Sequence, residues 1–138
     1  MTRLRYLLDT DILVAIRRGR PAGVKARFEQ LQPGEAALSV ISYGELLYGI
    51  EKQQLGPEPL RQLEELVSLI PVLPLSADAA RIYGAIRAAL AIRGEIIGAN
   101  DPWIAAHAQA NDLILVSNNE REFRRVAGLK LENWMRQT

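Results

Sequence analysis

Acidic and amide side chains stand where apolar segments of the sequence end, which is where an α/β protein presents ligand-binding groups. Asp9 and Asp11 follow the apolar run at 6–8, and Asn119 comes shortly after the apolar run at 113–116. The strands of a parallel sheet end on one edge, and ligands of open α/β sheets bind at that edge. We therefore expect Asp9, Asp11 and Asn119 to lie close together.

Two further carboxylates belong to helices expected to begin at the same edge. Glu45 lies early in the helix after the second strand, and Asp101 precedes a proline at the start of another helix. Carboxylates crowded in one pocket repel each other and lose solvation, so such a cluster needs a compensating charge. Because its ligands would all be oxygens, a hard divalent cation, Mg²⁺ or Mn²⁺, is the natural compensation. A bound ion of this kind supports the hydrolysis of phosphodiester bonds.

The composition excludes several other chemistries. The sequence has no cysteine and one histidine, which removes disulfides, thiolate zinc sites, a cysteine nucleophile and catalysis by a pair of histidines. Lys and Arg (17) nearly balance Asp and Glu (16), so the net charge of +1 does not by itself indicate a nucleic-acid partner. No apolar run approaches the roughly 20 residues of a membrane span, and no signal peptide precedes the first strand. We expect one domain over residues 1–138, soluble and cytoplasmic.

Apolar periodicity and turn residues predict an alternation of strands and helices. We expect strands at 6–8, 36–41, 71–75 and 113–116, with a short last strand within 129–134. Helices are expected from about residues 12, 21 and 42, over 57–70 and 77–92, from 101, and from 120 to about 127. Prolines place the third strand at the sheet edge, whereas the apolar run at 113–116 suits a central strand. The expected fold is α/β, with a central, mostly parallel sheet of four to five strands.

Several of the polar residues also have an ordinary structural explanation. Ser42 and Glu45 fit a capping box at the start of a helix, and Asp101 before proline fits a helix N-cap. His107 fits a packing or surface residue, because it lies too far along its helix to partner Asp101. The basic residues within 17–27 fit either a solvated surface or a contact with RNA phosphates.

Four motifs, in this order, resemble a known family. They are LLDTD at 7–11, SYGELLYG at 42–49, NDPWIAAHA at 100–108, and LILVSNNEREF at 113–123 followed by GLKLENW at 128–134. Together they cover nearly the whole chain and closely resemble the PIN-domain ribonuclease toxins of the VapC type. The resemblance implies a PIN-like three-layer α/β/α fold. It also implies a Mg²⁺- or Mn²⁺-dependent endoribonuclease that forms the toxin half of a bacterial or archaeal toxin–antitoxin pair.

The resemblance assigns roles to particular residues. The family's three acids fall on Asp9, Glu45 and Asp101, as catalytic residues and metal ligands, with Glu45 binding directly or through water. The fourth position, Asp or Asn in the family, falls on Asn119. Because Asn119 is neutral, Glu122 becomes a candidate ligand through water. The family usually has Asn at the position of Asp11, which here either adds a charge to the pocket or caps the first helix.

The resemblance also implies two protein partners. The helices at 57–70 and 77–92 carry wider apolar stripes than a small sheet needs, and the resembling toxins pair through helical surfaces, so we expect a homodimer. Such toxins also bind an antitoxin of the VapB type, whose tail crosses the toxin's groove. We expect apolar tail residues to lie near Leu46–Ile50. An Arg of the tail would enter the acidic pocket, because its planar guanidinium pairs with two carboxylate oxygens.

Three other functions remain open from the sequence. A haloacid dehalogenase-like phosphatase also has two acids after its first strand, but would place Thr or Val where this chain has Leu13, and a later Lys near paired acids. No lysine lies between Lys52 and Lys130. A receiver-like signalling module would need an Asp after strand three and a Lys after strand five, and residues 74–76 and 133–134 supply neither. A PIN-like module that binds RNA without cleaving it shares the residues named above, and an RNA cleavage assay with and without Mg²⁺ separates it from the nuclease.

Overall fold

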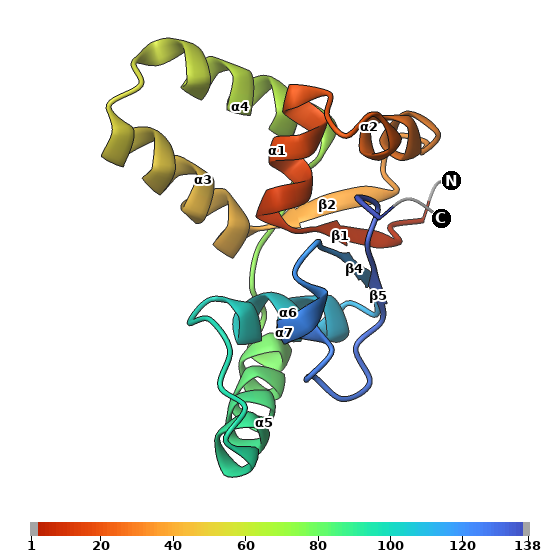
Figure 1. Cartoon of the computed structure of the whole chain (residues 1–138), viewed down its shortest axis with the longest axis vertical. Coiled ribbons are helices and arrows are strands. Elements are labelled where there is room, and N and C mark those ends of the chain that lie inside the picture. Colours follow the sequence, from red (N-terminus) through yellow and green to blue (C-terminus); the bar gives the residue numbers. More distant parts are fainter. Residues whose placement is uncertain (1–2, 137–138) are drawn as a thin grey trace.

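The strands form one parallel sheet in the computed structural model, which describes residues 3–136 (Figure 1). They are β1 (Tyr6–Leu8), β2 (Ala36–Ser39), β3 (Val72–Leu73), β4 (Ile114–Val116) and β5 (Leu131–Glu132). Their order across the sheet is β3-β2-β1-β4-β5, and each neighbouring pair is parallel. The short apolar runs of the sequence therefore become strands as expected, with β1 in the centre and the proline-flanked β3 at an edge.

Helices cover both faces of the sheet. They are α1 (Thr10–Arg18), α2 (Ala22–Glu29), α3 (Val40–Gln53), α4 (Pro57–Leu69), α5 (Ala77–Arg93), α6 (Asp101–Ala110) and α7 (Glu120–Phe123). Tyr6 and Leu8 pack into one apolar core with residues of α1 and α2, whereas Leu7 packs into a second core with residues of α5, α6 and α7. Side chains alternate along a strand, so three residues of β1 serve both cores. This confirms the three-layer α/β/α fold.

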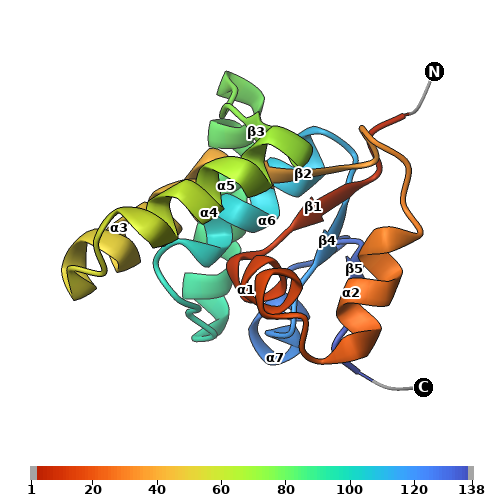
Figure 2. The same cartoon turned by 90° about the horizontal axis from the view of Figure 1, so that it is seen from above.

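The order of the strands reverses between β1 and β4, the position at which open α/β sheets have their binding crevice. From β1 the chain proceeds to β2 and β3 on one side, then returns to place β4 on the other side of β1. The loops after β1 and β4 consequently lead in opposite directions, and such a reversal is where α/β sheets bind ligands. Figure 2 shows α1 and α7, the helices that follow these strands, at the same end of the sheet.

Some of the predicted helix ends and caps differ from the structure. β2 ends at Ser39, whose side chain accepts a hydrogen bond from the N–H of Ile41 and caps α3, so the predicted Ser42–Glu45 capping box is wrong. Asp101 is the first residue of α6 and not its N-cap. The N-cap position belongs to Asn100, whose side chain makes no capping hydrogen bond. The last helix ends at Phe123 rather than near residue 127, since hydrogen bonds of three-residue spacing follow it.

His107 is a packing residue, as expected. Its ring is fully buried, with Nδ1 2.8 Å from Ser39 Oγ and Nε2 3.1 Å from the carbonyl oxygen of Pro74. The carbonyl can only accept, so Nε2 carries the proton and the Ser39 hydroxyl donates to Nδ1. Burial lowers the pKa of the ring. The imidazole thereby connects α6 to the end of β2.

Within residues 3–136, no helix is both long and apolar enough to cross a bilayer.

Candidate active site

Asp9 lies at this crevice position, between the ends of β1 and β4. Its backbone N–H donates to the carbonyl of Val116, and its side chain is only 8% exposed. The Ser117 hydroxyl donates to one carboxylate oxygen at 2.7 Å, and the N–H of Thr10 donates to the other at 2.9 Å. Asp9 therefore caps α1 while its carboxylate is held by the residue that follows β4.

Glu45 reaches the same crevice from α3. The hydroxyl of Thr10 donates to Glu45 Oε1 at 2.9 Å, which joins α3 to the first turn of α1. Because Ser39 caps α3, the Glu45 carboxylate is not used for capping. Its position beside Thr10 brings the Glu45 carboxylate close enough for its charge to raise the pKa of Asp9.

Asp101 belongs to a third group of side chains, which comes from the start of α6 and the start of α7. Asn119 Nδ2 donates to Asp101 at 3.2 Å and also to Glu122. The N–H of Gly98 donates to Glu122 Oε1 at 3.1 Å. A Cβ on Gly98 would lie 3.1 Å from Asp101 Oδ2, so a residue without a side chain permits this close approach.

Asp11 lies in the first turn of α1, where the backbone N–H groups of Asp11 and Ile12 favour its charged form, and its side chain also reaches the end of β4. The N–H of Asn118 donates to Asp11 Oδ2 at 3.0 Å. Its other oxygen is buried and has no hydrogen-bond partner in the described part of the chain. A buried carboxylate oxygen is costly when unpaired.

The carboxylates are close enough to affect one another's ionisation. Burial, and then the negative charge of Asp11, raises the pKa of Asp9 to about 6. Burial, then Glu122, then the charge of Asp9, raises the pKa of Asp101 to about 7. Burial also raises the pKa of Asp11, whereas the hydrogen bond from Asn119 lowers that of Glu122. No cation of residues 3–136 acts on the pKa values of Asp9, Asp11 or Asp101, so these acids form an anionic site without a compensating charge from the described chain.

The oxygen-rich donor set suits a hard cation, although the carboxylates do not yet surround a single point. Across residues 3–136, no three acidic or imidazole side chains converge closely enough to form a ready-made metal cage. Hydrogen bonds from Ser117, Thr10 and Asn119 hold the carboxylates in their present positions. The orphaned oxygen of Asp11 is the group most directly available to an ion.

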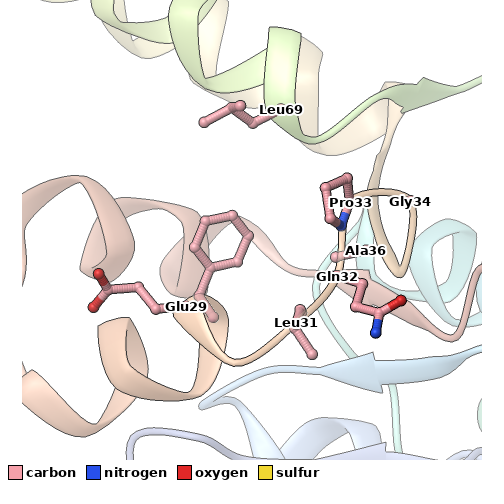
Figure 3. A pocket seen from close by; sticks show the side chains of 8 residues that line it. Glu29, Leu31, Gln32, Pro33, Gly34, Ala36 and Leu69 are labelled. Atoms are coloured by element: carbon pink, nitrogen blue, oxygen red, sulfur yellow. The ribbon is translucent and has the colours of Figure 1, made fainter. Parts of the chain in front are cut away.

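A hollow at the other end of the sheet lacks these features. It has a volume of about 190 Å³ and lies between the segment that leads into β2 and the end of α4. Figure 3 shows Leu31, Pro33 and Ala36 on one side and Leu69 on the other. Glu29 is the one ionisable residue in its lining, so this hollow does not resemble a catalytic site.

Comparison with known proteins identifies the family to which the chain belongs. The sequence model of the PIN domain matches residues 6–129. The tRNA(fMet)-specific endonuclease VapC of Shigella flexneri is 44% identical over 131 residues, 95% of this chain and 98% of that protein. Ribonuclease VapC2 of Haemophilus influenzae is 41% identical over 132 residues, 96% of this chain and 99% of its own length. The chain belongs to the VapC ribonuclease family of PIN-domain proteins.

Solved structures of VapC proteins share the fold over their whole length. The DNA-bound VapBC complex of Salmonella typhimurium matches with a TM-score of 0.88 and 36% identity, covering 95% of this chain and 98% of that one. VapBC2 of Rickettsia felis, bound to a promoter DNA fragment, matches with a TM-score of 0.87 and 36% identity, covering 95% and 99%. The α/β/α architecture is therefore that of VapC.

The residues that sequence analysis assigned to a VapC site do meet in one crevice, although their roles stay predictions. The structure gathers Asp9, Glu45, Asp101 and Asn119 there, together with Asp11 and Glu122, which sequence analysis had named as further candidates. Sequence analysis missed three residues that hold them, which are Ser117, Thr10 and Gly98. A hydroxyl next to a strand end was the available signal for Ser117 and Thr10.

We expect the metal-free VapC chain to lose stability as the pH rises from about 4 to about 7. The folded-state pKa values of Asp9 and Asp101 exceed 3.8, the ordinary value, so the folded protein binds more protons than the unfolded one in this range. The free energy of unfolding therefore falls as these groups ionise. Asp9→Asn removes one of them and should be roughly 2 kcal/mol more stable than the wild type at pH 7.5, and much less so at pH 4.

Urea unfolding with a chelator at the two pH values measures this difference. Asp112→Asn is the matched control, because Asp112 is exposed and its partner Lys130 lowers its pKa. It should show no gain at pH 7.5. An equal effect of Asp9→Asn at both pH values would contradict the electrostatic explanation.

Proposed function

We propose that this chain is a Mg²⁺- or Mn²⁺-dependent endoribonuclease whose active site is the carboxylate cluster at the ends of β1 and β4. The main support is the meeting of Asp9, Asp11, Glu45 and Asp101 in one crevice without a compensating positive charge. Membership of a family whose curated relatives are named ribonucleases and endonucleases supports the reaction. PIN-domain nucleases generally depend on a divalent metal; Mg²⁺ or Mn²⁺ is our choice on the basis of the oxygen ligands.

In this proposal Asp9 and Asp101 hold the ion, and Glu45 binds it directly or through water. Asp11, Asn119 and Glu122 are weaker candidates, of which Asp11 offers an unpaired buried oxygen. When bound, the ion would supply an activated water and neutralise charge on the scissile phosphate. The site needs neither a histidine nor a cysteine.

The chain's own residues orient the acids. The Ser117 hydroxyl fixes the carboxylate plane of Asp9, and the Thr10 hydroxyl fixes that of Glu45. The Asn119 amide does the same for Asp101 and Glu122. These donors are neutral, so they position the acids without removing the negative charge that attracts a cation. Ligands held in place by a second set of hydrogen bonds bind metals more tightly.

The RNA is proposed to be a tRNA. The relative from Shigella flexneri is named as specific for tRNA(fMet), and at 44% identity it supports the initiator tRNA as the first substrate to test. The same assay includes an elongator tRNA and a phosphatase substrate. Hydrolysis of the phosphatase substrate would favour a phosphatase instead.

We expect purified protein to cleave the initiator tRNA with Mg²⁺ or Mn²⁺ and to stop when a chelator is added. Asp101→Asn should lower kcat by at least about 100-fold, because it removes one charge on which metal binding depends. Glu45→Gln keeps the size and hydrogen-bonding capacity of the side chain and tests the charge alone. Asp112→Asn, an acidic residue outside the crevice, should cleave like the wild type. Full activity of Asp101→Asn would exclude this cluster as the active site.

We further propose that the chain acts as a toxin held in check by a VapB-type antitoxin. Solved relatives are VapBC complexes. A hollow of about 270 Å³ between α1, α3 and α4 offers a place for the antitoxin's tail, with apolar Val14, Leu46 and Ile50 along it and Glu45 at the acidic site. An Arg of the tail would pair with the carboxylates of Asp9 and Asp101.

Expression of this chain alone should arrest growth, and co-expression of the antitoxin should restore it. An antitoxin whose tail Arg is changed to Ala should still bind through the apolar residues but inhibit cleavage much less. Undiminished inhibition would rule out insertion of the Arg. Harmless expression of soluble, active nuclease would rule out the toxin role.

A homodimer is proposed as well. Ile92 at the end of α5 and Ile96 after it are 85% and 74% exposed, and Leu69 of α4 is 66% exposed. Large apolar side chains exposed in this way favour an interface between copies. Sedimentation at micromolar concentration should give about twice 15.4 kDa, and a mass near 15.4 kDa would contradict the dimer.

A further inference from the structure

Four neighbouring cations of this chain lack an acidic partner. Arg17, Arg18, Arg20 and Lys25 are exposed, and within residues 3–136 they make no ion pair, hydrogen bond or ring contact through their side chains. No Asp or Glu occurs between residues 12 and 28. Most other cations do have carboxylate partners, namely Arg5, Arg27, Arg61, Arg81, Arg93, Arg124, Arg125, Lys130 and Arg136.

These four residues, which we call the basic corner, lie where α1 ends and α2 begins. A Cβ on Gly19 would lie 3.8 Å from Lys25 Cδ, so the Lys25 side chain folds back over the turn between the helices. Arg17 and Arg18 line the hollow that also contains Thr10 and Glu45. Because Thr10 donates to Glu45, this hollow leads directly from the basic corner to the acidic site.

A second set of contacts links the turn before α2 to the acidic cluster. α2 ends where the chain turns into the start of β2, so its first turn is the end farther from the start of β2 (Figure 2). Pro21 and Gly23 share a hollow with Asn133 and Trp134, which follow β5. Asn133 in turn donates to Asn118, whose N–H donates to Asp11. Two series of neighbouring residues therefore connect the turn between α1 and α2 to the acidic cluster.

Helix electrostatics explains only part of this arrangement. Arg17 and Arg18 lie in the last turn of α1, where cations favourably face the negative end of the helix dipole. Arg20 lies outside the helices, and Lys25 is in the middle of α2. A bound polyanion, by contrast, would be attracted by all four positive charges.

An RNA substrate needs such a surface because the active site itself repels phosphate. The crevice contains Asp9, Asp11, Glu45 and Asp101, and one or two divalent ions only neutralise these charges. Net attraction for the neighbouring phosphates has to come from cations placed outside the crevice. Unpaired arginines are well suited to this role, since a phosphate can take the guanidinium fork without displacing a carboxylate.

We propose that the basic corner binds the phosphates of the RNA strand on one side of the scissile bond. This inference rests on the proposed ribonuclease function and adds the path of the substrate. The strand passes from the carboxylates over Arg18 and Arg17 towards Arg20 and Lys25. An antitoxin tail in the hollow beside Arg17 and Arg18 would then block the path of the RNA as well as the acids.

The test compares two triple variants with the same change in charge. One variant replaces Arg17, Arg18 and Arg20 with Gln. The control variant replaces Arg3, Arg5 and Lys130 with Gln, and these residues precede β1 and β5 at the opposite end of the sheet. Binding of a labelled single-stranded RNA is measured by fluorescence anisotropy in chelator over a series of salt concentrations. Cleavage by the same proteins is then measured with Mg²⁺.

For the corner variant we expect a weaker salt dependence: the negative slope of log K against log salt should become shallower by roughly 2, since each of three lost phosphate contacts on a single strand contributes about 0.7. Its KM for RNA should rise roughly ten-fold or more, with the loss in KM rather than in kcat. The control variant should bind and cleave like the wild type. Replacing the same three arginines with Lys should restore most of the affinity, because phosphate attraction needs the charge.

Equal salt slopes and KM values for the corner and control variants would overturn the inference. So would a corner variant that loses affinity for the antitoxin but none for RNA, because the surface would then serve the protein partner. A wild-type protein that binds RNA through the corner but never cleaves it would instead refute the nuclease function and leave the binding surface in place. Circular dichroism of each variant verifies that it is folded.

Discussion

Asp9 is a buried carboxylate with no cationic partner among the described residues, and keeping it in place is the constraint on which the rest of the site depends. Burial and the charge of Asp11 oppose its ionisation, whereas hydrogen bonds from Ser117 and from the N–H of Thr10 favour it. Ser117 is available only because β4 lies beside β1. The return of the chain to the centre of the sheet is therefore a requirement of the chemistry as well as of the fold.

Neutral donors and positive charges have separate places in this molecule. Around the acids, hydroxyl, amide and backbone N–H groups hold each carboxylate in position and leave its charge uncompensated. The unpaired arginines stand outside the crevice, at the turn between α1 and α2. A guanidinium placed among the acids would form ion pairs and remove the attraction for a metal ion. This separation explains how a chain with a net charge of +1 can attract both a cation and a polyanion.

Sequence reasoning located the acids more reliably than it explained them. Apolar runs that end in polar residues indicate strand ends, and parallel strands share an edge, so Asp9 and Asn119 were placed correctly. The capping predictions failed for Glu45 and Asp101 because a local pattern such as Ser-x-x-Glu does not reveal that Ser39 already caps the helix. The role of Gly98 depends on a distance to Asp101 across a loop, and the unpaired state of the basic corner depends on where the carboxylates of other elements lie. Neither can be read from neighbouring residues.

The pairing of β1 with β4 also sets the time at which the site can form during synthesis. Asp9 and the hydroxyl that holds it are 108 residues apart in the chain. Ribosomes add roughly 5–20 residues per second, so Asp9 is made many seconds before Ser117. Until β4 emerges, β1 can pair only with β2, and Asp9 lacks the Ser117 hydroxyl that orients its carboxylate. A nascent chain therefore has no assembled active site until Ser117 has been added, so toxicity begins only when synthesis is nearly complete.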